Sequence, residues 1–493
     1  MGKTEKLEIE MKKSMMPLEA IPFITSNNIT YLRPVKAIVR NEYDEETYDY
    51  DIQVLTPILE KIILKEEHFK FVSDGNLGST LIYGYRNGYY QLMSENQFKG
   101  VIANWIPHEI RKSKDLDEIY KLLLTENEVY ITMSDLNTDI DYINFRNGLL
   151  NTKTMKLEPH TPDKFFTVQL PLDYKPLNEC KYGATFERYM EKLCDDDEIM
   201  YNTLLEIMGL VLSNYPGHLT KKCLLMYGKK DTGKSQLKLL LTKLLGLNYT
   251  SSVELSQLSK GSFATSTIYN KRLAGSNDLK YSGIDDMSMF KQLIGGDAIN
   301  VEFKNKTPFP YVFTGFLWFL ANDLPKFSGK KEAAIYERFV IMPCNNVVTK
   351  EERDPHIIDK MLEEREYIVS LCINHLKKLV DRKFELLESD RMKSCLEEYE
   401  IENNTLLQFV EECCVVLEEN PKSDDRLVVK EFKRMYQNWC QYNNVKPIAL
   451  RPKEMLYYLE PKYGTKINPI HGTNKFSNIK FKEYLDIPMY GNY

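Results

Sequence analysis

Residues 224–245, LLMYGKKDTGKSQLKLLLTKLL, constrain this chain more than any other segment. An apolar run ends at Tyr227, the spacing G-x-x-x-x-G-K-S follows over residues 228–235, and a leucine-rich helical pattern begins near Lys234. A strand, a glycine turn and a helix in this order direct backbone N–H groups and the positive end of a helix into one space, which suits a triphosphate. Because a chance glycine turn rarely has both flanks correct, we predict a nucleoside triphosphate site.

Each residue type in this loop has a physical task. Lys234 is expected to reach the β- and γ-phosphates and Ser235 to ligate Mg²⁺. Glycines permit a backbone approach that a Cβ would block. The motif alone does not distinguish kinases, packaging motors, helicases and switches, because all of these classes contain it. The residues expected to contact ATP are Gly228, Lys229, Lys230, Asp231, Thr232, Gly233, Lys234, Ser235 and Gln236.

Length and composition limit the classes of protein. A chain of 493 residues, 43% of them hydrophobic, is long enough for about three domains with buried cores. Its net charge of −6 means that nucleic-acid contacts need local basic patches. No apolar run approaches a membrane span, and the start MGKTEKLEIEMKK lacks a signal-peptide core. We expect a cytoplasmic protein without membrane contact, whose nine cysteines, with no C-x-x-C pair, are reduced core thiols.

Pattern and composition divide the chain into five blocks. Residues 1–120 form an N-terminal α/β module, with a helix over 55–65 and strand-like pieces over 79–92. Residues 121–214 form a connector that ends in a helical run over 186–212. Residues 215–345 alternate strands and helices like a doubly wound sheet. Residues 346–425 are helical, and 426–493 form a compact basic tail.

Three further segments after the glycine loop carry candidate site residues. KRLAGSND is an apolar run that ends in Asp278, as expected of a strand beside the first one that carries a metal-binding acid. FTGFLWFLAND ends at Asn322, whose amide could orient the attacking water or contact the γ-phosphate. AAIYERFVIMP places Arg338 before another buried strand, at a subunit edge and outside its own loop's pocket.

A hairpin with lysines near its tip is predicted between these segments. MFKQLIGGDAINVEFKNKTPFPY reads as a helix, a Gly-Gly-Asp turn and two strand-like pieces around Lys304 and Lys306. Asp139 and Asp141, earlier in the chain, could suggest a metal site, but Asx-rich turns are common and no third ligand is near. We therefore give these two aspartates no role.

The order of these segments resembles the superfamily 3 helicase domain of AAA+ ATPases, in the branch of poxvirus-type and of phage or plasmid primase-helicases. The segments are, in order, GKKDTGKS, RLAGSND, FKQLIGGDAI, FLWFLAND and ERFVIMP. INFRNGLLNTKTMKLEPHTP resembles the segment that precedes this domain in that branch, so the likeness covers residues from about 60 to the end. Replication initiators of staphylococcal pathogenicity islands and similar mobile elements are the relatives that it suggests. The fold so implied is α/β: an AAA+ P-loop ATPase core with an N-terminal α/β module, a helical connector and a C-terminal winged helix.

The resemblance also implies roles for single residues. Lys234 and Ser235 would contact phosphate and metal, Asp278 would act on Mg²⁺ or water, Asn322 would be the sensor, and Arg338 the arginine finger given to a neighbouring subunit. Lys304 and Lys306 would line a central pore. The chain departs from the family's pattern in Thr232, where Asn is usual, in Asp278, where Glu is usual, and in Glu302, where Arg is frequent. Asp285 or Asp286 could assist Asp278.

The basic tail supports DNA binding independently. It reads as a helix, a turn, a helix and a short hairpin, which is a winged-helix plan. The helix over 451–463 would enter a major groove, with Arg451, Lys453 and Lys462 near phosphates or bases and Lys475 on the wing. The alternative is that these lysines form an ordinary solvent-exposed face that does not bind DNA.

Together these features predict an ATP-dependent DNA helicase and replication initiator of a mobile element or phage. We expect a homo-oligomer, a hexameric ring, that uses ATP and Mg²⁺, holds single-stranded DNA in its pore and binds double-stranded origin DNA through the winged helix. No primase activity is expected, since neither a zinc-type cysteine set nor a carboxylate triad precedes the loop; a separate primase or host replication proteins would be partners. The alternatives are an origin-binding ATPase switch that melts DNA without processive unwinding, and a packaging or transport motor.

Overall fold

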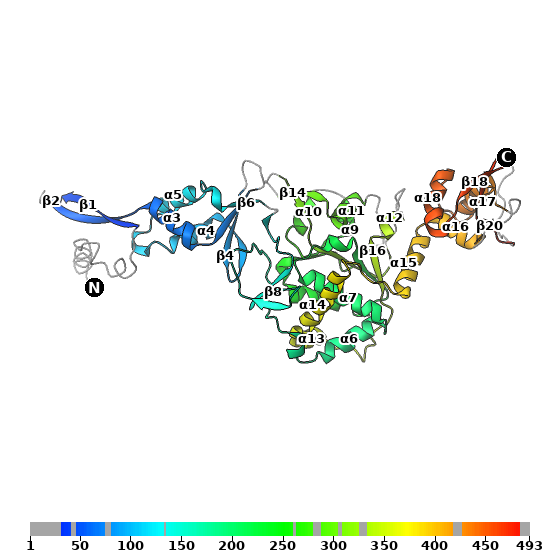
Figure 1. The fold of residues 1–493 in the computed structure, drawn as a ribbon, viewed down its shortest axis with the longest axis horizontal. Helices are drawn as coiled ribbons and strands as arrows, with labels where there is room; N and C mark the ends of the chain where they lie inside the picture. Colours follow the sequence, from blue (N-terminus) through cyan, green and yellow to red (C-terminus); the bar gives the residue numbers. More distant parts are fainter. Residues whose placement is uncertain are drawn as a thin grey trace. The chain divides into compact units, whose positions relative to one another are not determined.

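A computed structural model provides the structure of the chain (Figure 1). By their contacts the residues form two units, 1–173 with 304–309, and 174–303 with 310–493, and each unit is described by itself. The division after Asp173 falls inside the expected connector, 121–214. The structure describes residues 31–40, 46–73, 80–132, 135–259, 263–279, 287–303, 308–324, 333–417 and 426–483.

The first unit contains a four-stranded sheet in the order β5-β4-β3-β6, a three-stranded sheet β7-β8-β9 and a β1–β2 pair. Leu59, Ile63 and Ile102 of its helices are buried in one core with Phe69 and Phe71 of β3. Its elements are β1 (Leu32–Arg40), β2 (Glu46–Val54), α3 (Thr56–Glu66), β3 (Phe69–Ser73), β4 (Thr80–Arg86), β5 (Tyr89–Met93), α4 (Glu95–Ala103), α5 (Ser113–Leu123), β6 (Tyr130–Thr132), β7 (Tyr142–Phe145), β8 (Gly148–Asn151) and β9 (Lys156–Glu158).

Two elements expected in the N-terminal block are present in this unit. The helix expected over 55–65 is α3, and the strand-like pieces over 79–92 are β4 and β5. Asn87 and Gly88 join these strands with φ values of 53° and 91°, the left-handed pair that a two-residue hairpin turn requires.

The second unit is built on a five-stranded sheet in the order β11-β12-β15-β10-β16, whose paired strands are all parallel. This confirms an α/β class with a parallel sheet. Strands covered on both faces read as continuous apolar runs, as the fully buried FLWFLA and FVIMP do. The strands are β10 (Cys223–Tyr227), β11 (Thr250–Ser251), β12 (Leu273–Ala274), β15 (Phe316–Ala321) and β16 (Phe339–Pro343).

The order of these strands corrects one expectation. The strand before Asp278, β12, was expected beside β10, the strand that leads into the glycine loop. Instead, β15 pairs with both β10 and β12 and so lies between them. Apolar sequence identifies which segments are buried strands, whereas their order depends on how the intervening helices cross the sheet.

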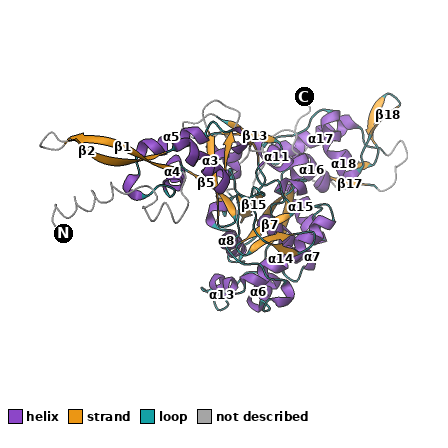
Figure 2. Cartoon of the chain, turned by 60° about the vertical axis from the view of Figure 1, so that its left-hand side comes forward, coloured by secondary structure: helices purple, strands orange, loops and turns teal. Residues whose placement is uncertain are grey.

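Helices cover this sheet. In both cartoon views α7 and α14 lie side by side (Figures 1 and 2). The helical run expected over 186–212 is two helices, because Asp195 and Asp196 adopt left-handed φ values of 55° and 59° that end the first one. The helices are α6 (Ala184–Cys194), α7 (Glu198–Leu212), α8 (Lys234–Leu245), α9 (Leu255–Ser259), α10 (Phe263–Ile268), α11 (Ser288–Gly295), α12 (Ala333–Tyr336), α13 (Ile357–Glu363), α14 (Arg365–Asp381) and α15 (Asp390–Glu402).

The hairpin expected after the Gly-Gly-Asp turn is present in its strands. After α11, Gly296 adopts a φ of 79° and caps the helix, and β13 (Ala298–Val301) then pairs with β14 (Phe309–Val312). Lys304 and Lys306 fall between these strands but lie outside the described residues.

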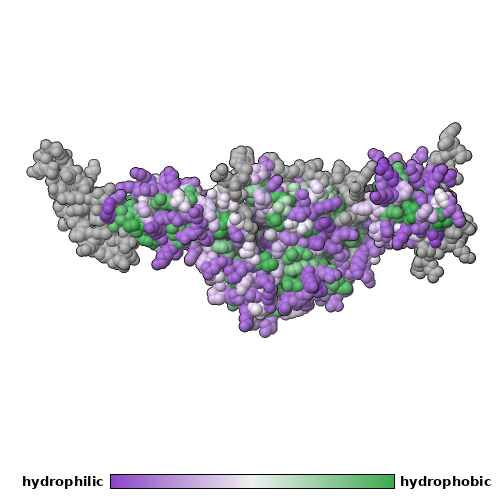
Figure 3. Space-filling model, turned by 45° about the horizontal axis from the view of Figure 1, so that its top comes forward, coloured by the Kyte–Doolittle hydropathy of each residue, from purple (hydrophilic) through white to green (hydrophobic). Residues whose placement is uncertain are grey.

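The C-terminal part has its own apolar core, in which Phe409, Phe432, Tyr436 and Trp439 are buried. The helix expected over 451–463 is α18. The face of the molecule drawn in Figure 3 is covered largely by hydrophilic residues, with smaller hydrophobic patches between them. The elements are α16 (Thr405–Cys413), β17 (Cys414–Val416), α17 (Val429–Tyr442), α18 (Pro452–Tyr463), β18 (Ile467–Ile470), β19 (Thr473–Phe476) and β20 (Ile479–Phe481).

The central strand gives a stability prediction. Leu225 is fully buried and faces Phe319 and Ile341 on its two neighbouring strands. Leu225→Ala should lower the free energy of unfolding by about 2–5 kcal/mol, the usual cost of a core cavity. Leu247→Ala, at a position that is 76% exposed, is the control. Urea unfolding followed by tryptophan fluorescence measures both, and equal midpoints would contradict this assignment of the core.

Candidate functional site

The glycine loop connects β10 to α8 at the carboxyl end of the sheet. Gly228 and Gly233 have φ values of 139° and 94°. A Cβ on Gly228 would lie 2.1 Å from the carbonyl oxygen of Cys344. The loop therefore needs glycine for both its conformation and its close contact with the residue after β16.

Lys234 is the first residue of α8, and its side chain turns back over the loop. Its Nζ donates to the carbonyl oxygens of Gly228 at 2.8 Å and Lys229 at 2.6 Å, and to Oγ1 of Thr232 at 3.1 Å. Burial lowers the pKa of Lys234. These contacts place an ammonium group among backbone dipoles at the positive end of a helix, an arrangement that attracts a polyphosphate.

Tyr189 of α6 supports the loop from outside and was not predicted. Its hydroxyl donates to the carbonyl oxygen of Gly233 at 2.5 Å, and a Cβ on Gly233 would lie 2.9 Å from that hydroxyl. Burial raises the pKa of Tyr189, so the hydroxyl remains a donor. Forty-four positions separate the two residues, and no local sequence pattern marks the tyrosine.

A cavity of about 410 Å³ opens beside the loop. Asn277, which follows β12, and Asn322, which follows β15, line it together with the glycine loop. Asn322 therefore lies at the same cavity as the glycine loop. Asp278 is exposed and adjoins Asn277, which is the residue that lines the cavity at this point. The lining residues are Lys230, Asp231, Thr232, Gly233, Lys234, Ser235, Gln236, Asn277, Leu320, Ala321 and Asn322.

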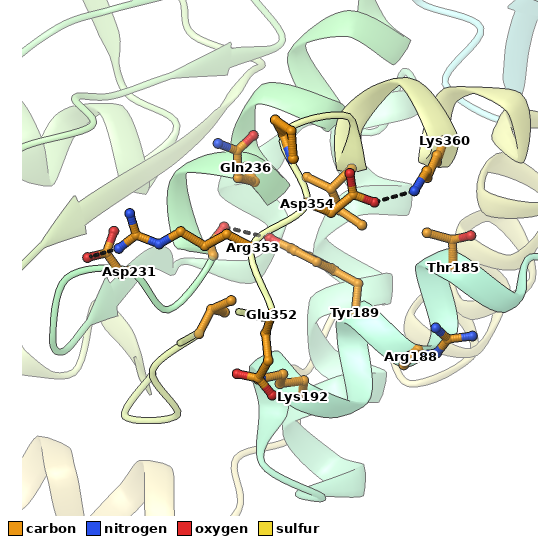
Figure 4. A pocket seen from close by; sticks show the side chains of 14 residues that line it. Thr185, Arg188, Tyr189, Lys192, Asp231, Gln236, Glu352, Arg353, Asp354 and Lys360 are labelled. Carbon is orange, nitrogen blue, oxygen red and sulfur yellow. Dashed lines mark hydrogen bonds and ion pairs between the residues drawn. The ribbon is translucent and has the colours of Figure 1, made fainter. Parts of the chain in front are cut away.

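A second cavity, of about 650 Å³, shares Asp231, Gly233 and Gln236 with the first and is lined further by α6 and the segment after β16 (Figure 4). Ion pairs of 2.7 Å between Arg353 and Asp231 and of 2.6 Å between Lys192 and Glu352 hold the segment after β16 against the loop and α6. Hydrogen bonding from Lys192 is the main reason that the pKa of Glu352 falls to about 2. Arg353 also neutralises the one carboxylate of the glycine loop, which leaves its lysine charges uncompensated.

Arg338 lies at the opposite edge of the sheet. β16 is parallel to β10 and begins directly after Arg338, with Phe339 in register with Cys223. The glycine loop begins after the far end of β10, and five residues of strand span roughly 16 Å. Arg338 therefore lies well away from its own glycine loop. Asp285 and Asp286, like Lys304 and Lys306, lie outside the described residues.

The cationic residues of the tail differ in their surroundings. Arg451 and Lys453 are exposed at the start of α18. Lys462 instead forms a 3.5 Å ion pair with Glu400 of α15, and its side chain is only 17% exposed. Lys475 lies within β19 opposite Asn468, near the base of the β18–β19 hairpin. Arg451 also lies 3.9 Å from Glu454, but its side chain is 84% exposed, so the amino end of α18 is a more accessible cationic surface than Lys462.

Three earlier expectations concern other parts of the chain, namely two aspartates, the cysteines and membrane helices. Asp139 and Asp141 form ion pairs with Lys164 and Lys153, so both carboxylates have a structural role. All nine cysteines are free thiols, and most are buried. Among the described residues, no helix combines the length and apolar character needed to cross a membrane.

Two family descriptions match parts of the chain. Residues 82–195 match the family described as D5 N terminal like. Residues 226–338 match a family of unknown function, DUF5906. The first match contains the segment INFRNGLLNTKTMKLEPHTP, and the second contains the glycine loop, Asn277 and Asn322.

Among solved structures, three apo structures of the NrS-1 C-terminal region are similar to this chain. Two are 13% identical and cover 86% of this chain and 98% of that chain. The third is 14% identical and covers 86% of this chain and 99% of that chain. All three have a TM-score of 0.46. At that score the likeness is partial, and the function proposed below rests on the residues of this chain.

The contact between Tyr189 and the loop can be tested directly. Tyr189→Phe keeps the ring and removes the donor to Gly233, and a hydrogen bond of this kind is worth about 0.5–1.5 kcal/mol. Affinity for a fluorescent ATP analogue should fall about 2- to 12-fold. Tyr182→Phe, whose side chain is 61% exposed, is the control. Equal affinities of the Tyr189 variant and wild type would show that this support does not matter.

Proposed function

We propose that the protein is an ATP-dependent DNA helicase and replication initiator of a mobile genetic element or phage. The observation that carries the proposal is the convergence of the glycine loop, Asn277 and Asn322 on one cavity at the carboxyl edge of a parallel sheet. Open α/β sheets bind ligands at this edge. The D5 N-terminal-like match at residues 82–195 supports the resemblance to primase-helicases.

The residues at this edge fit ATP with Mg²⁺. Gly228 and Gly233 give the loop its positive φ values of 139° and 94° and allow close contacts with Cys344 and Tyr189 that a Cβ would prevent. Ser235 is exposed in the first turn of α8 and supplies a hydroxyl oxygen, the type of ligand that Mg²⁺ prefers. When bound, Mg²⁺ would neutralise phosphate charge. Ser235 and Asp278 are the proposed metal ligands.

Within this site the chain's own groups would act by position and charge. Lys234 would leave its loop carbonyls and hold the transferring phosphate as a point charge. Asn322 would orient a water molecule through its amide. Asp278 adjoins the cavity, and its carboxylate would accept the proton of that water. Asn277, which lines the cavity, would keep this short loop against the phosphates.

We place the nucleoside half of ATP in the second cavity. Asp231, Gly233 and Gln236 line both cavities, so a ligand whose phosphates lie beside Lys234 can extend past them toward α6. The exposed side chain of Arg188 and the hydroxyl of Thr185 line the far wall. They can donate hydrogen bonds to a ribose or a base.

The position of Arg338 supports the proposal of a ring. This residue lies at the amino edge of the sheet, away from its own glycine loop, and an arginine finger supplied to a neighbouring subunit needs such a position. A closed set of head-to-tail contacts makes a ring. We expect a hexamer, with Lys304 and Lys306 holding single-stranded DNA in the pore.

The tail is proposed to bind double-stranded origin DNA. Its order of helix, strand, two helices and a hairpin supports the proposed winged helix. Lys453 and Tyr457 are one helical turn apart on α18 and both are exposed. With Arg451 they form the surface that we assign to a major groove. An ATPase switch that melts an origin without unwinding would use the same tail, whereas a packaging motor would not need it.

Strand displacement on forked DNA decides between motor and switch. Wild-type protein should hydrolyse ATP and separate the strands, and Lys234→Ala should lose both activities. Removing a charge of this kind from a transition state commonly costs on the order of 3 kcal/mol, more than 10²-fold in rate. Lys243→Ala, an exposed change on the same helix, is the control. Hydrolysis by the Lys234 variant at the wild-type rate would refute the site, and hydrolysis without displacement in wild type would favour the switch.

The tail gives a separate prediction. The double variant Arg451→Ala, Lys453→Ala should bind origin DNA more weakly, and the slope of log K against log salt should fall by about 1–2 units, since each lost phosphate contact reduces counterion release. Lys462→Ala should bind DNA almost as wild type does, because Lys462 is paired with Glu400. Fluorescence anisotropy over a salt series measures these affinities. A larger loss for Lys462→Ala would assign the DNA surface to the other end of α18.

A further inference from the structure

The ladder between β12 and β15 breaks just before the cavity. Ala274 pairs with Leu317, and the register continues to the 3.1 Å hydrogen bond from Leu320 N–H to the Ser276 carbonyl. In a regular parallel ladder the N–H of Asp278 would next donate to the Leu320 carbonyl, but the donor is the N–H of Leu279, at 2.8 Å. The chain therefore carries one extra residue, a bulge at Asn277 and Asp278 beside the phosphate cavity, which Asn277 lines.

Gly275 precedes the bulge and is in close contact with β15. Its φ is 133°, and a Cβ there would lie 2.2 Å from the carbonyl oxygen of Trp318. The backbones approach too closely for any side chain at this point. Gly275 and Trp318 are both buried, so their carbonyls need a hydrogen-bond donor within the protein.

Lys238 supplies that donor. It lies one turn after Lys234 on α8, and its Nζ donates to the carbonyl oxygens of Gly275 at 2.8 Å, Ser276 at 3.2 Å and Trp318 at 2.8 Å. Lys238 is 5% exposed, and burial lowers its pKa to about 7. Three acceptors at hydrogen-bond distance match the three donors of an ammonium group and offset the cost of burying it.

We propose that Lys238 is a positioning residue for nucleotide hydrolysis, which fixes the bulge of Asn277 and Asp278 against the helix that carries Lys234 and Ser235. This role rests on the proposed function. One side chain joins all three parts of the site, since Trp318 belongs to the strand that ends before Asn322. Lys238 contacts backbone carbonyls and lies behind the cavity, so it orders the groups that would contact the nucleotide.

A role in packing alone would need no lysine. The positions around it on α8, Leu237, Leu240 and Leu241, are buried leucines, and a leucine at position 238 would fill the space without burying a charge. An ammonium group instead makes directional contacts with both strands. A shift of about 1 Å in catalytic groups can lower a rate on the order of 10²-fold, which is the effect expected when these contacts are lost.

The test uses Lys238→Met, which keeps the length of the side chain and removes its donors, with Lys243→Met as an exposed control on the same helix. In the full-length variant, kcat for ATP should fall on the order of 10²-fold, while KM and the Kd of a fluorescent ATP analogue change by less than about 3-fold. Without nucleotide, amide exchange over residues 273–279 should become faster, and exchange over β10 should not. The control should match wild type in all four measurements.

A second variant disturbs the same junction from the other strand. Gly275→Ala should also lower kcat with little change in KM, because its Cβ would displace Trp318. If Lys238→Met does not fold, this variant provides the test. Unchanged kcat and exchange in a folded Lys238→Met protein would overturn the proposal, and so would a uniform increase in exchange across the sheet with kcat and KM affected alike. If wild type hydrolyses no nucleotide, the proposed function fails, while the exchange data still show whether Lys238 fixes the bulge.

Discussion

The position of β15 between β10 and β12 is the constraint on which the rest of the site depends. Parallel strands lie about 4.8 Å apart, so groups that follow β10 and β12 begin roughly 10 Å from each other at the carboxyl edge. Asn322 then follows the middle strand, between the glycine loop and Asn277. That spacing leaves room for a phosphate chain, and Asn277 in the bulge after β12 lines the cavity on its outer side. The order of three strands thus sets the width of the cavity.

Charge at this edge runs against the charge of the whole chain. The protein has a net charge of −6, yet Lys230 and Lys234 line the cavity, and Asp231, the one carboxylate among the described residues that line it, is paired with Arg353. The positive end of α8 adds to the same field. Local pairing therefore makes a positively charged cavity in an acidic protein, which is why composition alone could neither predict nor exclude it.

The sequence predicted the parts of this site that depend on local chemistry. The glycine loop, the buried strand before Asn322 and helix α18 each follow from a short pattern whose physical cause lies within it. The sequence could not predict the contact of Tyr189 with the loop or the order of the strands, because both depend on contacts between distant segments. The pairing of Lys462 with Glu400 is of the same kind. Lys238 left a signal that can be read in retrospect: a lysine on the buried leucine side of α8.

The tail is joined to the carboxyl edge of the sheet through α15. Arg391 of this helix donates to the carbonyl oxygen of Pro343 at 3.2 Å, and Pro343 is the last residue of β16. The next residue, Cys344, donates from its N–H to Tyr227 at 2.7 Å and contacts Gly228 at the start of the glycine loop. At its other end α15 carries Glu400, the partner of Lys462 on α18. A displacement of the glycine loop would therefore be transmitted first to the base of α15, because close-packed backbone contacts leave little space to absorb it.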